Sequence, residues 1–239
     1  MINVCVLGNS HVASLYQAWT NIIHERYSDV NFDFYAERGT KLYGLFYDNG
    51  VITTNDEVLE NALNFTSNNK MPIDISFYDV FIIYGSGIKP YFASNGFYSE
   101  AVLNQSIKDN TNNVLGIYLL NMLREATNKK IYFGHNPLVS RGISESKKNN
   151  EDYRKGISFI NKRYYNNKNS MLISQPDITI VNGRNTKPIY TSGSRKLSIG
   201  KKTDEELHPE LDNVHMNSDF GVLWLEETLN YIEKDILSK

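Results

Sequence analysis

The chain has 239 residues, a formal net charge of −2 and one cysteine, Cys5. One cysteine excludes an intrachain disulfide and a cysteine-based zinc cluster. The near-neutral charge argues against nucleic-acid binding by bulk electrostatics, and the 41% hydrophobic content is too high for a disordered chain. A chain of this length can bury a complete core, so we expect a single domain over residues 1–239.

No segment has the pattern of a targeting signal or a membrane span. Residues 1–8 lack a basic region, and their apolar run is too short for the core of a signal peptide. Nowhere do about 18 apolar residues follow one another, as a transmembrane helix requires. We therefore expect a cytoplasmic protein, with Cys5 reduced and buried in the first strand.

Short apolar segments alternate along the chain with amphipathic ones. The short segments predict strands over 2–7, 31–36, 78–84, 130–133 and 178–181, and a minor hairpin strand over 51–54. The amphipathic segments predict helices over 12–23, 57–65, 97–107, 113–127, 151–165 and 217–237. Segment 183–210 has little periodicity and is predicted to be a long loop. The alternation predicts an α/β fold, a three-layer α/β/α sandwich around a mostly parallel central sheet.

The predicted strands end in small or polar residues, and four of these ends stand out. They are residues 8–11, 39–40, 85–87 and 134–136. In open parallel sheets, ligands bind beyond the carboxyl ends of the strands. We therefore expect these four segments to converge at one edge of the sheet and to form the functional site there.

Ser10 is the first candidate for a chemical role. It follows the first predicted strand and opens a helix, where unpaired N–H groups and the helix dipole favour developing negative charge. That position suits a nucleophile and half of an oxyanion hole. The alternative is structural, because serine is also a preferred residue for capping a helix.

Asp212 and His215 are the matching candidates near the other end of the chain. An aspartate three residues before a histidine can place both side chains on one side of a turn, where the histidine acts as a base and the aspartate fixes its tautomer. The alternative is a turn followed by a helix cap. The serine block is not the Gly-x-Ser-x-Gly elbow of α/β-hydrolases, because Val12 stands where the second glycine belongs.

These two blocks resemble those of the SGNH (GDSL-type) hydrolase superfamily, and the chain looks like one of its divergent bacterial members linked to surface-polysaccharide modification. Members carry a serine after the first strand in a Gly-Asp-Ser block and a late Asp-x-x-His block. The matching residues here are Gly8-Asn9-Ser10 and Asp212 with His215. The resemblance implies a flavodoxin-like SGNH hydrolase fold and a Ser-His-Asp catalytic triad.

The resemblance also implies an oxyanion hole, which departs here from the family pattern. The family uses a glycine after strand two, a role that falls to Gly39, and a Gly-x-Asn after strand three. That second position reads Gly85-Ser86-Gly87, and Asn9 replaces the usual aspartate. Loss of one oxyanion donor costs roughly 2.7–4 kcal/mol, so an active site needs a substitute. The candidates are backbone N–H groups of the two glycines at 85 and 87, the serine hydroxyl between them, and the Asn136 amide.

Other polar residues near the predicted site have two possible roles each. His11 either lines the substrate pocket or is a polar residue of the early helix, and His135 either lines the pocket or stabilises its turn. A metal site built from Asp204, His208, Asp212 and His215 matches no strong zinc pattern, so we predict no metal. The strand-end cations Arg38, Lys89 and Arg141 and the basic run 195–202 are expected to be solvated surface charges.

Three functions stay open on these observations. The first is a serine esterase that removes a small acyl group, such as acetyl, from a carbohydrate or related small-molecule ester, without a cofactor. The second is an O-acetyltransferase that acts on a surface polysaccharide and takes its acyl group from acetyl-CoA. The third is a non-catalytic SGNH-like carbohydrate-binding module. A Ser10 hydroxyl within about 3 Å of a His215 nitrogen supports catalysis, and a much larger separation supports binding alone.

Overall fold

The computed structural model describes residues 1–93, 96–141 and 150–237. Its central sheet has five parallel strands in the order β2-β1-β6-β7-β8. Their bounds are β1 Ile2–Gly8, β2 Val30–Ala36, β6 Val80–Tyr84, β7 Lys130–Gly134 and β8 Ser170–Ile173. Two small antiparallel sheets join β3 Leu45–Asp48 with β4 Val51–Thr54 and β5 Ile73–Asp74, and β9 Ile180–Val181 with β10 Asn185–Thr186.

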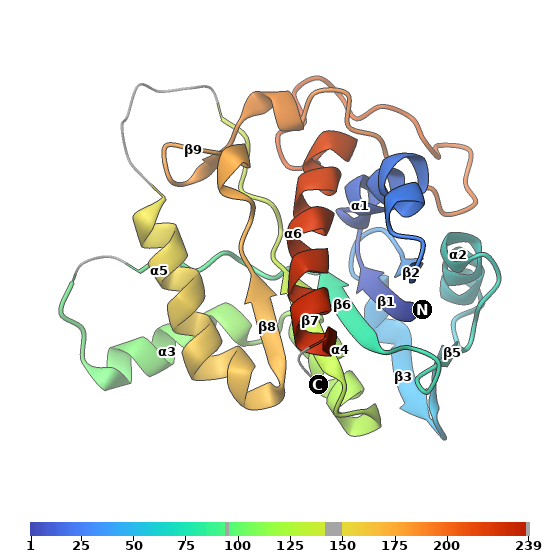
Figure 1. The fold of residues 1–239 in the computed structure, drawn as a ribbon, viewed down its shortest axis with the longest axis horizontal. Helices are drawn as coiled ribbons and strands as arrows, with labels where there is room; N and C mark the ends of the chain where they lie inside the picture. Colours follow the sequence, from blue (N-terminus) through green and yellow to red (C-terminus); the bar gives the residue numbers. More distant parts are fainter. Residues whose placement is uncertain (94–95, 142–149, 238–239) are drawn as a thin grey trace.

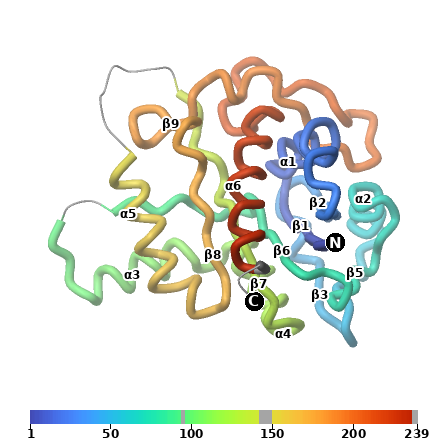
Figure 2. Tube along the Cα trace, in the orientation of Figure 1, coloured from blue at the N-terminus to red at the C-terminus, as the bar shows by residue number. Residues whose placement is uncertain are grey.

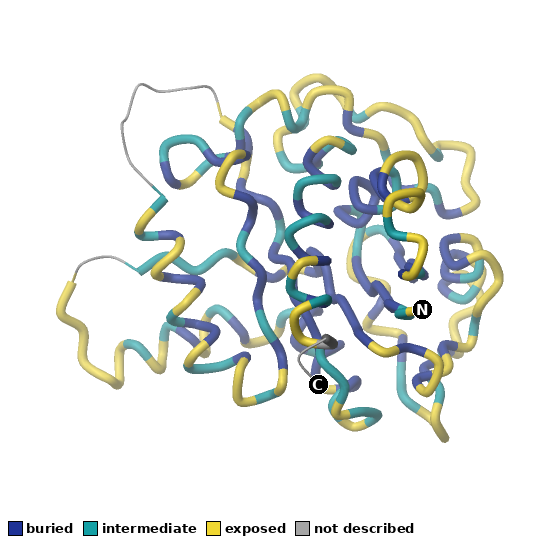
Figure 3. The backbone as a smooth tube through the Cα atoms, in the orientation of Figure 1, coloured by how far each residue is buried: buried dark blue, intermediate teal, exposed yellow. Residues whose placement is uncertain are grey.

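Helices cover both faces of the central sheet (Figure 1). They are α1 Val12–Ala18, α2 Glu57–Ser67, α3 Glu100–Thr111, α4 Leu115–Ala126, α5 Glu151–Ile160 and α6 Ser218–Leu237. Alternate strand residues supply two buried clusters, one packed against α1 and α6 and the other against α2, α4 and α5. Figure 3 shows the strands buried between these helical layers. The predicted three-layer α/β/α sandwich is therefore confirmed. No described helix is long and apolar enough to cross a membrane.

The strand register aligns the carboxyl ends that the sequence singles out. Gly8 of β1 pairs with Ala36 of β2 and with Tyr84 of β6, and Tyr84 pairs in turn with Gly134 of β7. Because these strands are parallel, the loops that follow them leave from the same edge of the sheet. The expected convergence of residues 8–11, 39–40, 85–87 and 134–136 at one edge follows from this register.

Close approach of the backbone fixes the two helices that flank this edge. A Cβ on Gly8 would lie 2.4 Å from the Tyr84 carbonyl oxygen, so only glycine allows the sharp turn from β1 into α1. A Cβ on Gly221 would lie 2.1 Å from the Ser14 carbonyl oxygen, so α6 packs directly on α1. Figure 2 shows the two helices running side by side. The residues just before α1 and just before α6 are thereby brought together, although they are about 200 positions apart in the sequence.

The structure corrects two predictions about individual elements. The strand predicted over 178–181 is the two-residue β9, outside the central sheet, whereas the fifth central strand is β8. The four residues of β8 are too few to show an alternating hydrophobic pattern, and they form a strand because they pair with β7. The predicted 12–23 helix changes to a π turn over Trp19–Ile23. The wider turn rotates Ile22 outward to 40% exposure, while Ile23 stays buried.

Candidate active site

Ser10 lies in the turn between β1 and α1. His11 is the N-cap residue of α1, and its own side chain makes no capping hydrogen bond, while Asn9 Oδ1 accepts from the His11 N–H at 3.3 Å. The Ser10 hydroxyl Oγ instead lies 3.0 Å from Nε2 of His215. The capping alternative is therefore not what the structure adopts. The regular part of α1 has only seven residues, so the helix dipole adds less at Ser10 than the sequence suggested.

Asp212 holds His215 from the other side. Its carboxylate Oδ2 lies 2.9 Å from His215 Nδ1, and Oδ1 accepts hydrogen bonds from the backbone N–H groups of Val214 and His215 at 3.0 and 2.8 Å. Both carboxylate oxygens are thus engaged within one turn. Ser10, His215 and Asp212 form a continuous polar chain.

The charge on Asp212 fixes the tautomer of His215. Burial raises the pKa of the Asp212 carboxyl, but the hydrogen bonds from the His215 N–H, its ring and the Val214 N–H outweigh that effect and lower the pKa to about 2. The carboxylate is therefore ionised at neutral pH and accepts the Nδ1 proton. Nε2 is left unprotonated, in position to accept the Ser10 proton.

Residues 85–87, which follow β6, donate most of their hydrogen bonds to neighbouring residues of the same sheet edge. The Gly85 N–H donates to the Gly134 carbonyl at 2.9 Å, the Ser86 hydroxyl to the Tyr84 carbonyl at 3.3 Å, and the Gly87 N–H to Asn136 Oδ1 at 3.2 Å. These three groups, expected as oxyanion donors, are bonded within the sheet edge. The reason is backbone shape: residues 85–87 all have positive φ, which folds the turn back onto its own strand.

Asn136, Gly39 and Ser10 keep donors that are not engaged in this way. Because Asn136 Oδ1 accepts from Gly87, its Nδ2 amide is directed elsewhere, and it donates to no described residue. The N–H groups of Gly39 and Ser10 likewise make no hydrogen bond within the described residues, and a Cβ on Gly39 would meet only open space. These three are the donors that the geometry leaves for an oxyanion.

His135 has a structural contact set. It is buried, its Nδ1 bonds the Asn136 carbonyl at 2.6 Å, and its Nε2 accepts from the Tyr153 hydroxyl at 2.5 Å. The ring therefore ties the end of β7 to α5 and fixes the backbone of Asn136. Of the two readings drawn from the sequence, these contacts favour turn stabilisation.

We expect the stability of the fold to fall as the pH drops from about 6.5 to 4, in part through His135. Burial lowers the pKa of His135 to about 4, so the native ring stays neutral while the unfolded chain takes up a proton below about 6.5. Each pH unit in that window removes up to about 1.4 kcal/mol per such histidine. Melting temperatures of wild type and His135→Asn across this range provide the measurement. An equally steep decline in both proteins would contradict the assignment.

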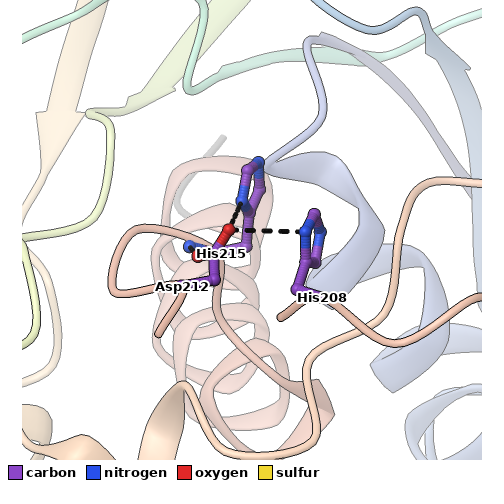
Figure 4. Close-up of side chains that lie close together, drawn as sticks. All are labelled: His208, Asp212 and His215. Atoms are coloured by element: carbon purple, nitrogen blue, oxygen red, sulfur yellow. Dashed lines mark hydrogen bonds and ion pairs between the residues drawn. The ribbon is translucent and has the colours of Figure 1, made fainter. Parts of the chain in front are cut away.

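Two further imidazoles flank His215. His208 stacks on it with ring centroids 3.9 Å apart and planes 5° apart, and His208 Nδ1 lies 3.4 Å from Asp212 Oδ2. His11 lies on the His215 ring at 5.1 Å with a 31° tilt, and burial lowers the pKa of His11 to about 3. Figure 4 shows both His208 and His215 directed at one carboxylate oxygen. The sequence offered His208 only as a weak metal ligand.

The stacking of His208 on His215 does not suit a shared metal ion. The cluster of His208, Asp212 and His215 has three ligand-type atoms close together. Imidazole binds a metal along a lone pair in the plane of its ring, and two nearly parallel stacked rings have no common point in both planes. Asp204, the fourth residue considered for a metal, pairs with Arg38 at 3.0 Å instead.

Arg38 has a role that the sequence did not indicate. Its guanidinium donates to the Leu197 carbonyl, to the Thr203 hydroxyl and carbonyl, and to Asp204. The sequence predicts a solvated surface charge at this position, whereas Arg38 instead holds the loop that leads to His208. A residue 159 positions away in sequence supplies its main partner, so no local pattern could reveal it.

Comparison with known proteins gives only distant structural likeness. No family model matches the chain, and no curated protein matches it. The periplasmic domain of a lipopolysaccharide acetyltransferase from Salmonella ser. Paratyphi A is 15% identical with a TM-score of 0.47, over 96% of this chain and 83% of that one. The gut microbial diltiazem-metabolizing enzyme BT4096 is 12% identical with a TM-score of 0.36, over 72% of this chain and 36% of that one. Likeness at this level carries no functional argument.

Proposed function

We propose that this chain is a serine-dependent esterase that removes a small acyl group from a carbohydrate or related ester. The observation that carries the proposal is the polar chain from Ser10 Oγ through His215 to Asp212, with contacts of 3.0 and 2.9 Å. The Ser10–His215 separation meets the hydrogen-bond reach that catalysis requires. It therefore favours an enzyme over a binding module.

The reaction follows from the proton positions in this chain. Ser10 Oγ attacks the ester carbonyl carbon while His215 Nε2 takes the hydroxyl proton. The imidazolium then gives that proton to the leaving alcohol oxygen, and the acyl group remains on Ser10. Water attacks the acyl-enzyme, again losing a proton to Nε2. The bond between the acyl carbon and Ser10 Oγ then breaks, the imidazolium returns the proton to Oγ, and the acid is released. In this reaction the N–H groups of Ser10 and Gly39 and the amide of Asn136 donate to the oxyanion.

The exposure of the site supports an ester carried by a large molecule. The side chains of Asp212 and His215 keep 15% and 20% of their surface exposed. A sugar bearing an acetyl group can approach such a site without entering a deep tunnel. If a sugar hydroxyl replaces water in the second step, the same residues perform transfer, which keeps the O-acetyltransferase as the second candidate.

The test of the proposal is turnover with covalent trapping. We expect the protein to hydrolyse p-nitrophenyl acetate, and a fluorophosphonate probe to add to Ser10, located by mass spectrometry of peptides. Acetylated oligosaccharides come next, with and without acetyl-CoA and an unacetylated acceptor. The name of the Salmonella domain guides this choice of acyl group and acceptor but does not support the assignment. Absence of both turnover and labelling would refute the esterase and favour a binding module.

A further inference from the structure

Two imidazoles contact the same oxygen of Asp212. Oδ2 lies 2.9 Å from His215 Nδ1 and 3.4 Å from His208 Nδ1, and the two rings are stacked almost parallel (Figure 4). A triad needs only one of these histidines. His208 therefore has a geometry that the proposed mechanism does not yet use.

The backbone holds His208 firmly in this position. Segments 194–196 and 206–208 pair as a short antiparallel ladder, in which the His208 N–H donates to the Ser194 carbonyl at 2.9 Å and the Lys196 N–H to the Glu206 carbonyl at 2.9 Å. Arg38 clamps the connection between them through the Leu197 carbonyl and Asp204. An imidazole placed by such a ladder can serve as a rigid surface for its neighbour.

The environment keeps His208 uncharged. Burial lowers the pKa of His208, and the nearby His215, Lys196 and Arg38 lower it further, against the raising effect of Asp212. His11, at the N-cap of α1, lies close to the His215 ring, and burial lowers its own pKa. A neutral His208 with its proton on Nδ1 directs an N–H dipole at Oδ2. Its Nε2 is buried and has no partner among the described residues.

We propose that His208 is a positioning residue for His215, acting through the stacked ring and the shared carboxylate of Asp212. This inference rests on the proposed function. His215 must present Nε2 first to Ser10 and then to the leaving oxygen, and rotation of its ring would break that alignment. The His208 ring, stacked 3.9 Å away, and the tilted His11 ring, 5.1 Å away, restrict the rotation. Misplacement of catalytic groups by about 1 Å can cost on the order of 100-fold in rate.

The shared carboxylate has a separate effect from the stacked ring. The Nδ1–H of His208 draws part of the charge of Asp212 away from His215. The imidazolium of His215, which forms during the reaction, is then stabilised less than it would be by an undivided carboxylate. His208 thus holds the acid limb of the pH–rate profile at a lower pH than the triad alone would give.

Two substitutions separate these effects in the full-length protein. His208→Phe keeps a ring to stack and loses the Nδ1 dipole, so we expect kcat/KM on p-nitrophenyl acetate to stay within about threefold on the plateau, with an acid limb roughly half a unit higher. His208→Asn keeps a donor near the position of Nδ1 and loses the ring that stacks. We therefore expect kcat/KM to fall about tenfold or more, with the acid limb of the pH–rate profile unmoved. The control is His24→Asn, an exposed histidine in the 3₁₀ turn His24–Arg26 before β2, which should match wild type.

A low-field proton NMR spectrum separates failure of this inference from failure of the proposed function. The proton between His215 Nδ1 and Asp212 is observable without turnover, and in His208→Phe it should move further downfield, since the carboxylate then serves one imidazole. A shifted resonance in a protein without turnover would reject the esterase and keep the positioning role. An unshifted resonance, or wild-type pH profiles in both His208 variants, would overturn the positioning role. A purely structural role would lower the folded fraction without moving either readout.

Discussion

Ser10→Ala is expected to lower kcat for p-nitrophenyl acetate at least about 10³-fold and to abolish labelling by a fluorophosphonate. The substitution removes the only atom that can form the acyl-enzyme in the proposed reaction. The fold should be unaffected, because the Ser10 hydroxyl caps no helix and, among the described residues, bonds only the His215 ring. Melting temperature and circular dichroism of the variant check that expectation directly.

Ser28→Ala is the matched control for this result. Ser28 is an exposed serine in the turn that leads into β2, at the amino end of that strand and away from the sheet edge that carries Ser10. It should keep wild-type turnover and labelling. Equal rates for Ser10→Ala and wild type would remove the catalytic assignment, even if the protein hydrolyses the ester, because the activity would then arise elsewhere on its surface.

The core of the candidate site could be predicted because each of its parts is local in sequence. Ser10 follows an apolar strand that ends in glycine, and Asp212 stands three residues before His215. A parallel sheet then predicts where the site lies, since the carboxyl ends of its strands share one edge. The contact between α1 and α6 at Gly221 that joins the two parts could not be predicted, because it depends on a backbone approach with no local signal.

The other parts of the site depend on long-range contacts. The sequence predicts the Gly87 N–H as a candidate oxyanion donor. In the structure this N–H donates to Asn136 Oδ1, which follows another strand of the sheet. The sequence predicts a surface charge for Arg38. Its carbonyl partners could not be foreseen, because they lie in a loop without periodicity. The stacking of His208 likewise depends on the antiparallel ladder to Ser194. Sequence patterns indicate which groups are available, whereas tertiary contacts decide which of them are already engaged.

Asp212→Asn is expected to lower kcat by on the order of 10³–10⁴ while the fold stays intact. Asparagine has one oxygen where aspartate has two, and the Oδ1 position already accepts the N–H groups of Val214 and His215. The oxygen should remain there to preserve the turn, which leaves the amide NH₂ facing His215 Nδ1. That NH₂ can only donate, so the His215 proton moves to Nε2. A protonated Nε2 cannot accept the proton of Ser10.

This loss should be present throughout the range from about pH 5 to 8. The hydrogen bonds that outweigh burial at Asp212 hold its pKa at about 2, so the wild-type carboxylate is already ionised throughout that range. The variant therefore lowers the pH–rate profile throughout this range. Because it also removes the charge that stabilises the His215 imidazolium, its acid limb should move to lower pH, opposite to the shift expected for His208→Phe. Asp219→Asn, at an exposed position in the first turn of α6, is the control and should match wild type. If Asp212→Asn kept more than about a tenth of wild-type kcat, the orientation of His215 would have to come from another group, and stacked His208 would be the residue to substitute next.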